Sequence, residues 1–378
     1  MKWFFVLACL LPAFWVSFLA TWGMRWLSPR LGLIDKPAAR KVHRVPTPLG
    51  GGVGIICGVL LPLAAVQVCL WLWSGNPPTW IPLELRQHLP GAISRTPELW
   101  GVLAAAGVLA VMGLWDDFRP LPWQPRIAVQ FLMASLVVMS GVRATLFMTN
   151  PWIGGILSVL WLVVLVNSFN FLDNMDGLSS GIALIVSVMF AAMMLLKPGD
   201  PRWLVAGFFL VLAGALLGFL CHNWSPARIF MGDSGSYFLG FTIGSMTLQG
   251  TFYTPESSHD HVMLAPLCVL AVPLYDTLSV IWIRLREGRS PFQPDKKHFS
   301  HRLVALGLKP VQAVLTVHLT TLTTGIGGLL LYAVPDWTSG GLVLASVACI
   351  LAIIAILESA PRPAIAPPPS PTNPGAAD

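Results

Sequence analysis

Apolar runs long enough to enter a membrane recur along almost the whole chain and constrain its fold more than any other feature. Only 11% of the 378 residues are charged, against about 25% in soluble domains. Because a membrane span needs about 20 apolar residues, we expect an all-α integral membrane bundle of about eleven transmembrane helices, with ten as the alternative. The predicted spans are residues 3–22, 50–73, 99–115, 126–142, 152–168, 181–196, 203–221, 236–249, 262–283, 311–334 and 340–357.

The basic residues predict the orientation of this bundle, because cytoplasmic loops carry an excess of Lys and Arg. Most of the 23 Lys and Arg residues fall in odd-numbered loops. We therefore expect the N-terminus outside, the C-terminus in the cytoplasm, and a multi-pass protein of the cell (inner) membrane. This placement also accounts for the net charge of +6, and no binding motif indicates a nucleic-acid partner.

The chain consists of two regions that differ in composition. Residues 1–358 hold all the apolar runs and are expected to form one polytopic transmembrane domain with active-site loops on the cytoplasmic face. Residues 359–378 are rich in proline and have almost nothing to bury, so they predict a disordered, Pro-rich cytoplasmic tail. The first apolar run, residues 3–22, has no small-residue cleavage site, so we expect it to remain as a membrane span rather than to be removed as a signal peptide.

Carboxylates gather at the cytoplasmic ends of the predicted spans. Asp116 and Asp117 end the third span in GLWDDF, where the helix dipole and mutual repulsion disfavour both charges without a cation or water. The segment NSFNFLDNMDGL follows the fifth span. If the helix continues, Asn170, Asp173 and Asp176 at i, i+3 and i+6 face one cavity. A solvated helix end or a capping loop is the alternative in each case.

A third acidic segment, FMGDSGS, places Asp233 between two glycines ahead of the eighth span. Glycines let a ligand approach backbone amides, and a helix N-terminus favours anions. A simple helix cap is the alternative for Asp233. Inside the ninth span, Asp276 is costly unless it faces the bundle interior or a water-filled cavity, and the sequence leaves its role open.

Basic side chains that suit phosphate follow the ninth span. His298, His301 and Arg302 lie in HFSHRL and could form charge-assisted hydrogen bonds to phosphate, although a basic loop against anionic lipid is the alternative. Acids and cations on one membrane face together suit Mg²⁺-dependent chemistry on a phosphate ester. Such a site would handle a cytosolic nucleotide and a membrane lipid together.

Five ordered motifs between residues 33 and 310 make the chain resemble a known family. They are IDKPAARKVHRVPTPLGGG, GLWDDFRPL, NSFNFLDNMDGL, NWSPARIFMGDSGS and HFSHRL. They resemble the polyprenyl-phosphate N-acetylhexosamine-1-phosphate transferases of glycosyltransferase family 4, in particular the undecaprenyl-phosphate N-acetylglucosamine-1-phosphate transferase type.

The resemblance implies a reaction for cell-envelope polysaccharide synthesis, such as that of O-antigen. Undecaprenyl phosphate attacks the sugar-linked phosphate of a UDP-N-acetylhexosamine, with N-acetylglucosamine as the expected sugar. The reaction releases UMP and forms a lipid diphosphate sugar. The resemblance also implies Mg²⁺ as cofactor, with Mn²⁺ as the alternative, and a homodimer.

The resemblance further implies roles for individual residues. Asp233 matches the metal ligand, and the catalytic positions are Asp116, Asp117, Asp173 and Asp176. The substrate-binding positions are Asn170, Asn223, Phe230, Arg126, His298, His301 and Arg302, with Asn223 and Phe230 at uracil. Because a phosphate monoester has a second pKa of about 6, we expect the acidic pair to act electrostatically rather than as a base.

Two departures from the family pattern bear on these expectations. Ser300 stands where the family usually has a histidine, and Arg126 stands where relatives often have lysine. A phospho-N-acetylmuramoyl-pentapeptide transferase is an alternative function, although the first loop and HFSHRL fit the N-acetylglucosamine type better. A secondary transporter would place its polar groups near the bilayer midplane. An inactive scaffold is the alternative that Ser300 leaves open.

Overall fold

The computed structural model describes residues 2–36, 45–73, 75, 77–81, 83–143, 150–196, 201–250, 260–292, 295 and 297–359. Most of these residues are helical, which confirms the all-α prediction. The first half of the chain contains α1 (Lys2–Arg30), β1 (Ile34–Asp35), β2 (Thr47–Pro48), α2 (Gly51–Leu72), α3 (Leu83–Arg86), α4 (Leu89–Ser94), α5 (Thr96–Phe118), α6 (Trp123–Met139) and α7 (Pro151–Leu172).

The second half continues the bundle and ends in a long apolar helix. It contains α8 (Leu178–Leu196), α9 (Trp203–Asn223), α10 (Gly232–Gln249), the 3₁₀ helix η1 (Asp260–Leu264), α11 (Ala265–Val269), α12 (Ala271–Arg286), α13 (Phe299–Ala305), α14 (Pro310–Leu330) and α15 (Trp337–Ser359). Each of the eleven predicted apolar runs coincides with one long helix, except residues 262–283, which are divided among η1, α11 and α12.

The number of candidate spans is smaller than the eleven predicted from hydropathy. In the described part of the chain, eight helices are long and apolar enough to cross a membrane, or nine if the pair Asp260–Val269 and Ala271–Arg286, bent by 64°, forms one broken span. Helices α6 and α10 have 17 and 18 residues, about 26 and 27 Å at 1.5 Å per residue. Both are shorter than the hydrocarbon core of about 30 Å.

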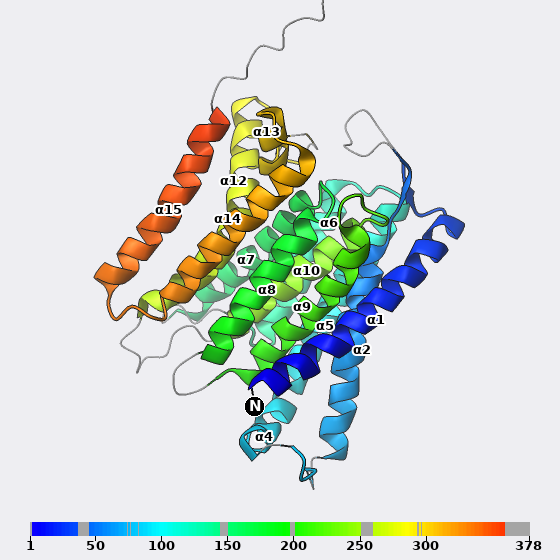
Figure 1. Ribbon diagram of the computed structural model, residues 1–378, viewed down its shortest axis with the longest axis vertical. Coiled ribbons are helices and arrows are strands. Elements are labelled where there is room, and N and C mark those ends of the chain that lie inside the picture. The colour runs from blue at the N-terminus through cyan, green and yellow to red at the C-terminus, as the bar shows by residue number, and fades with distance from the viewer. Residues whose placement is uncertain are drawn as a thin grey trace, which may run out of the picture.

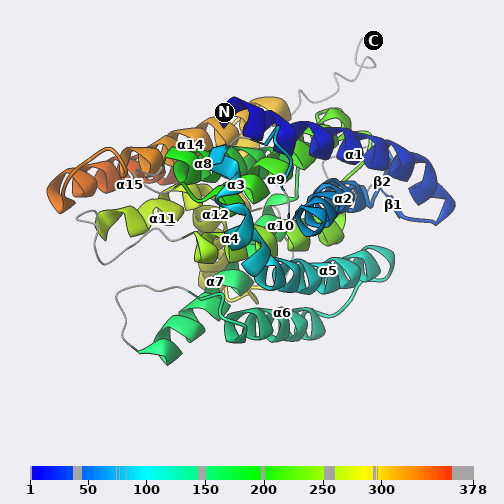
Figure 2. The ribbon, with the colours of Figure 1, turned by 90° about the horizontal axis from the view of Figure 1, so that it is seen from below.

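Helix α10 lies at the centre of the bundle, among α2, α5 and α7 (Figure 2). Nearly all its side chains are buried, so protein rather than lipid surrounds this helix. Small residues permit the close packing, as is common between helices in membranes. A Cβ added to Gly240 would lie 2.5 Å from the carbonyl oxygen of Leu165, and one added to Gly52 would lie 2.3 Å from the backbone nitrogen of Gly235.

The chemistry-bearing segments meet at one end of the bundle. The backbone N–H of Gly51, at the start of α2, donates to the carbonyl of Phe230, just before α10. At the opposite end, Lys2 Nζ at the start of α1 donates to the carbonyl of Leu195 near the end of α8. Figure 1 shows the N-terminus at this second end, whereas α13 and the last turn of α15 lie at the first.

A short β-hairpin that the sequence analysis did not predict leads from α1 to α2. Strands β1 and β2 are antiparallel, and Ile34 pairs with Pro48. The Pro48 carbonyl also accepts a hydrogen bond from the backbone N–H of Phe230. The hairpin therefore docks on the segment that precedes α10. Residues 37–44 of the first basic loop lie outside the described residues.

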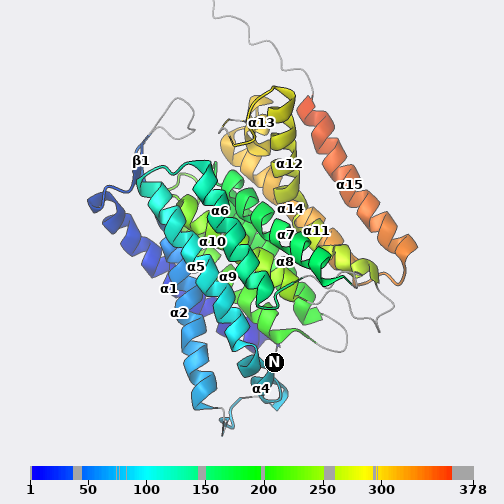
Figure 3. The same ribbon diagram turned by 180° about the vertical axis from the view of Figure 1, so that it is seen from behind.

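The predicted proline-rich tail is described only at its first residue. Ser359 is still the last residue of α15, and residues 360–378 lie outside the described part of the chain. Figure 3 shows α15 at the edge of the bundle, beside α12 and α14. Few side chains of α15 are buried, so most of its surface is available to lipid.

We predict that Gly52→Ala destabilises the protein by about 1–3 kcal/mol, the usual cost of an extra carbon in a close-packed site. The added Cβ would meet backbone atoms of Gly235, which cannot rotate away as a flexible side chain can. The measurement is the thermal unfolding temperature in detergent. Gly101→Ala in α5 is the matched control, because its Cβ would meet nothing within 4 Å. Equal unfolding temperatures for the two variants would contradict the packing argument.

Candidate active site

Asp233 lies in the first turn of α10, at the end of the bundle where the acidic segments meet. Its Oδ1 accepts a hydrogen bond from Asn170 Nδ2 at 2.8 Å, and its Oδ2 accepts one from the Tyr237 hydroxyl at 3.4 Å. Arg126 Nη1 lies 3.6 Å from the same Oδ2. The Asp233 side chain is 29% exposed. Its carboxylate is therefore held by neighbours from α6 and α7 and can still reach a ligand.

The acidic pair at the end of α5 has two different sets of partners. Asp116 is 8% exposed, and its Oδ2 lies 2.7 Å from Arg126 Nη1. Asp117 is directed at α10 instead. Its Oδ1 accepts the backbone N–H of Asp233 at 2.9 Å, and its Oδ2 accepts that of Ser234 at 3.4 Å. Because the first N–H groups of a helix have no partner within it, Asp117 caps α10 from a neighbouring helix.

Glycines allow this close contact between α5 and α10. Gly232 has a φ of +77°, which side-chain-bearing residues rarely adopt, and a Cβ there would lie 2.5 Å from Asp117 Oδ2. A Cβ on Gly113, in α5, would lie 2.5 Å from the Asp233 carbonyl oxygen. The sequence analysis assigned the glycines beside Asp233 to ligand approach. In the structure Gly232 lets α5 approach α10 and thereby positions Asp233, whereas Gly235 lies against Gly52 of α2.

The segment after α7 forms a turn rather than a continued helix. Helix α7 ends at Leu172, so Asn170, Asp173 and Asp176 do not share one helical face, and that expectation was wrong. Gly177, with a φ of +70°, completes the turn. Whereas Asn170 faces Asp233, Asp176 Oδ2 accepts the backbone N–H of Ala227 at 3.0 Å. The turn therefore divides the three polar side chains between two neighbouring parts of the site.

Asp173 lies in this turn beside Asp233. Burial raises the pKa of Asp173 to about 7, and the negative charge of Asp233 acts in the same direction, because both disfavour the ionised carboxyl. Asp116 and Asp117 add two more carboxylates to the cluster, and Arg126 is the cation that the structure pairs with it. Among the described residues, these acids outnumber the cations paired with them, which favours binding of a cation.

The donor set of this cluster suits Mg²⁺. Carboxylate oxygens are the protein ligands that Mg²⁺ prefers, and the ion often takes only one or two of them together with substrate phosphates and water. Asp233 offers a partly exposed carboxylate, with Asp173 beside it. Among the described residues, no group of three or more His, Cys, Asp or Glu side chains is arranged to hold a metal by itself. The residues therefore fit a metal site that a phosphate-bearing substrate completes.

Asn223, at the end of α9, makes three hydrogen bonds within the protein. Its Oδ1 accepts hydrogen bonds from the Gly177 N–H at 3.1 Å and the Ser180 hydroxyl at 2.9 Å, and its Nδ2 donates to the Ile229 carbonyl at 2.9 Å. The side chain is 3% exposed. Asn223 therefore joins the start of α8 to the segment before α10, which also contains Phe230. The contacts of Asn223 and Phe230 with uracil stay predictions.

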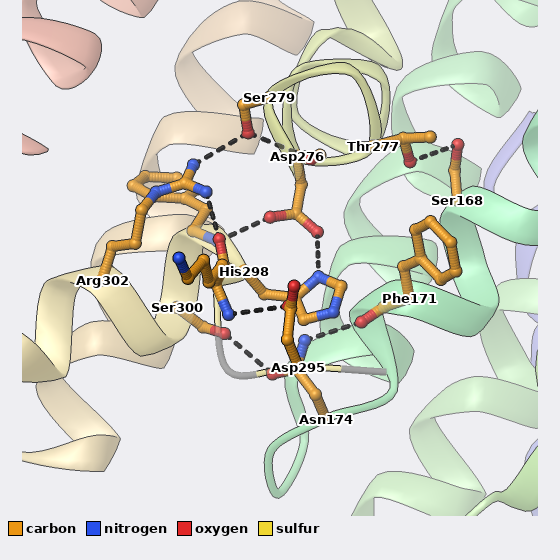
Figure 4. A network of polar contacts seen from close by, with 12 residues as sticks. Ser168, Phe171, Asn174, Asp276, Thr277, Ser279, Asp295, His298, Ser300 and Arg302 are labelled. Atoms are coloured by element: carbon orange, nitrogen blue, oxygen red, sulfur yellow. Dashed lines mark hydrogen bonds and ion pairs between the residues drawn. The ribbon is translucent and has the colours of Figure 1, made fainter. Parts of the chain in front are cut away.

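Asp276, whose role the sequence left open, holds the start of α13 (Figure 4). Its fully buried carboxylate lies in α12. One oxygen lies 2.9 Å from His298 Nδ1, and the other accepts the backbone N–H of Phe299 at 2.5 Å. The histidine ring also contacts the Phe171 ring edge-on, with centroids 5.6 Å apart. Asp276 therefore fixes His298 next to the end of α7.

The other residues of the HFSHRL segment have separate partners. His301 is partly buried, and its ring centroid lies 6.2 Å from that of His298. Ser300 is 2% exposed, and its hydroxyl donates to Asn174 Oδ1 at 2.7 Å. The Arg302 guanidinium pairs with Glu358 Oε2 at 2.9 Å. Ser300 thus bonds to the turn that carries Asp173, a function that motif comparison alone did not indicate.

The sequence analysis missed three residues around the site. Tyr237 lies one turn after Asp233, a spacing that could have indicated its contact with that carboxylate. Arg284 is 2% exposed, pairs with Asp295 at 2.9 Å, and lies over the Phe171 ring, 5.2 Å from its centroid. Because Arg284 lies at the end of an apolar run, the sequence alone does not indicate that its side chain is buried. Glu358 lies outside every motif, and no local signal identifies it.

The amino-acid sequence is similar to those of known proteins. The chain matches glycosyl transferase family 4 over residues 99–251. It is 30% identical over 318 residues to a probable undecaprenyl-phosphate N-acetylglucosaminyl 1-phosphate transferase of Bacillus subtilis, with 82% of this chain and 80% of that protein covered.

Two further relatives have similar names. A decaprenyl-phosphate N-acetylglucosaminephosphotransferase of Mycolicibacterium smegmatis is 32% identical over 327 residues, with 80% of this chain and 76% of that protein covered. An undecaprenyl-phosphate alpha-N-acetylglucosaminyl 1-phosphate transferase of Escherichia coli is 27% identical over 329 residues, with 83% and 81% covered.

We predict that Asn223→Ala lowers the stability of the protein by about 3 kcal/mol, because it leaves several buried polar groups without partners. Ser180→Ala removes only one of these hydrogen bonds and should cost about 1 kcal/mol. The measurement is thermal unfolding of the substrate-free protein in detergent. If Asn223 served only to contact a nucleotide, its removal would leave the unfolding temperature of the substrate-free protein unchanged.

Proposed function

Because this chain belongs to the glycosyl transferase family 4 polyprenyl-phosphate N-acetylglucosamine-1-phosphate transferases, we propose that it transfers N-acetylglucosamine 1-phosphate from a UDP-sugar to undecaprenyl phosphate. The products are UMP and a lipid diphosphate sugar for cell-envelope polysaccharide synthesis. The observation that carries the proposal is the cluster of Asp233, Asp173, Asn170 and Arg126 at one end of a membrane bundle. The printed names of the relatives supply the sugar and the class of acceptor.

The proposed reaction exchanges one phosphorus–oxygen bond for another. An oxygen of the lipid phosphate bonds to the sugar-linked phosphorus of the donor. The bond from that phosphorus to the oxygen bridging the two phosphates breaks, and UMP leaves with the electron pair. Because the second pKa of a phosphate monoester is about 6, the attacking phosphate is already largely dianionic at pH 7. Neither acid at the end of α5 needs to remove a proton from it.

The residues of the cluster have different roles in the proposed reaction, some in binding and others in positioning. We assign the divalent metal, Mg²⁺ with Mn²⁺ as the alternative, to Asp233 with Asp173 beside it. A bound divalent ion neutralises phosphate charge and polarises the phosphorus–oxygen bonds. Asn170 orients the Asp233 carboxylate, and Asp117 holds the helix turn that carries it. Asp116 holds Arg126 at 2.7 Å, which aims a guanidinium at the incoming phosphates.

Two other groups of residues complete the proposed substrate site. The segment with Asp176, Asn223 and Phe230 faces the nucleoside end of the donor, by resemblance to the family. His298 and His301 bind the donor phosphates or sugar, and Arg302 supports the same segment. Asp276 fixes the Nδ1 side of His298, so the opposite ring nitrogen is the one available to a ligand.

The same proposal includes a topology. We infer that the N-terminus lies outside, that the C-terminus and the candidate active site lie in the cytoplasm, and that the chain crosses the inner membrane eleven times. Supporting this, the ends of α5, α7 and α9 meet the starts of α2, α8 and α10, as successive crossings require. Arg126, Arg228 and Arg302 lie at that end, in agreement with the positive-inside rule. A homodimer is proposed by family resemblance alone.

We expect the purified protein to exchange radiolabelled UMP into UDP-N-acetylglucosamine when undecaprenyl phosphate and Mg²⁺ are present. EDTA should abolish the exchange. Asp233→Asn should lower the rate by about 100-fold or more, because it removes the negative charge assigned to holding the divalent metal. Asp260→Asn, at the opposite end of the bundle, is the matched control and should remain active.

Parallel reactions with UDP-N-acetylgalactosamine identify the sugar. Exchange with that donor alone would correct the sugar but keep the reaction. Folded protein that exchanges UMP with neither donor would overturn the proposed function. Release of UMP without formation of a lipid diphosphate sugar would also contradict it, because the lipid phosphate would then not be the acceptor.

The topology is tested with single cysteines in a cysteine-free background. Gln87 and Arg119 are both exposed and lie at opposite ends of the bundle. A maleimide that cannot cross membranes should label Gln87→Cys in intact cells, and Arg119→Cys only after lysis. The reverse pattern would invert the proposed orientation, and labelling of both residues in intact cells would place the two ends on one side.

A further inference from the structure

The C-terminal helix α15 is tied to the HFSHRL segment through one buried acid. The Glu358 side chain is 6% exposed although it lies near the end of a helix with few buried residues. Its Oε2 accepts hydrogen bonds from Arg302 Nε at 2.9 Å and from the Tyr275 hydroxyl at 2.8 Å. One carboxylate of α15 therefore contacts both α12 and α13.

Each nitrogen of the Arg302 guanidinium donates a hydrogen bond within the protein. Besides Glu358, it donates from Nη2 to the Ser279 hydroxyl at 2.9 Å and from Nη1 to the Lys297 carbonyl. Its side chain is 12% exposed. A guanidinium has five N–H donors in a fixed planar arrangement, and three nitrogens are used here. Arg302 thus acts as a link between α12, α13 and α15.

Helix α13 depends on such links for its position. It has only seven residues, and helices this short are not stable by themselves in water. Asp276 holds its first residues, and Glu358 holds Arg302, one turn later. These two acids come from different helices and hold the start of the short helix and a residue one turn later (Figure 4 shows the Asp276 and Arg302 contacts).

Ser300 connects α13 to the turn that carries Asp173. The Ser300 hydroxyl donates to Asn174 Oδ1 at 2.7 Å. Asn174 directly follows Asp173, and its Nδ2 donates to the Phe171 carbonyl at the end of α7. A displacement of α13 would therefore move the turn that carries Asp173, and with it the surroundings of Asp233.

We propose that Glu358 is a positioning residue for donor binding, which holds Arg302 and thereby fixes His298, Ser300 and His301 against the turn at Asp173. The proposal rests on the proposed function, since it assumes that this segment and this turn contact the donor. Burial of an acid is costly unless it is paired. The buried Glu358–Arg302 pair is explained if its role is to specify the position of α13.

The test compares Glu358→Ala, Glu358→Gln and Arg302→Met with the double variant Glu358→Ala/Arg302→Met. We expect Glu358→Ala to lower kcat/KM for the UDP-sugar by about 10- to 100-fold, the range typical of groups that orient a ligand-contacting residue. The KM for undecaprenyl phosphate should stay unchanged. Glu358→Gln, which can still accept both hydrogen bonds, should recover part of the loss. The double variant should be no worse than Arg302→Met alone.

Rates are expressed per folded molecule, from the monodisperse fraction in detergent, so that a loss of folded protein does not count as a loss of activity. Glu98→Ala is the matched control. It breaks the exposed Arg95–Glu98 pair, also 2.9 Å long, at the opposite end of the bundle. Its kcat/KM should equal that of the wild type. An unchanged kcat/KM in Glu358→Ala, or additive losses in the double variant, would overturn the proposal.

Amide hydrogen exchange provides a readout that does not require transfer activity. Residues 298–305 should exchange faster in Glu358→Ala than in Glu98→Ala, because α13 loses one of the side-chain contacts that hold it in place. Equal exchange in the two variants would overturn the positioning role whatever the activity. A wild-type protein that is inactive with every UDP-sugar would refute the proposed function instead, and exchange at residues 298–305 would still decide whether Glu358 fixes α13.

Discussion

The hydrogen bonds from the N-terminus of α10 to Asp117 are the contact on which the rest of the candidate site depends. They join the last turn of α5 to the first turn of α10, and they require a glycine at position 232, where any Cβ would strike the carboxylate. Because Asp233 lies in that same turn, its place relative to Arg126 follows from this cap. A carboxylate at the C-terminus of one helix is disfavoured by that helix, and here it is stabilised by the N-terminus of another.

The helices could be predicted from sequence because hydropathy is a local property, and each predicted run became a helix or a series of helical pieces. The number of crossings was harder to predict, because α10 is surrounded by protein and α11 and α12 are separated by a bend. Burial by neighbours, rather than the apolar content of the segment, decides how short or polar such a helix can be. Hydropathy does not contain that information.

The identity of the acidic residues was predictable, but their partners were not. Asp116 and Asp117 are adjacent in sequence and looked equivalent, yet one pairs with Arg126 and the other caps α10. The expected common face of Asn170, Asp173 and Asp176 failed because α7 ends before Asp173. Both outcomes depend on where neighbouring helices end, which is a property of the tertiary packing and not of the motif.

Their contacts separate the acids near the candidate site into two kinds. Asp117, Asp276 and Glu358 each face N–H or O–H donors from other segments, so the protein itself stabilises them. Asp233 also accepts hydrogen bonds from Asn170 and Tyr237, but it lies near Asp173, whose pKa is raised by burial and, in addition, by the charge of Asp233. Acids of the first kind hold helices in place, whereas in the proposed function a bound cation compensates the charge of the second kind. The acids that hold helices therefore position Asp233 and Asp173, the two acids that we assign to the proposed metal.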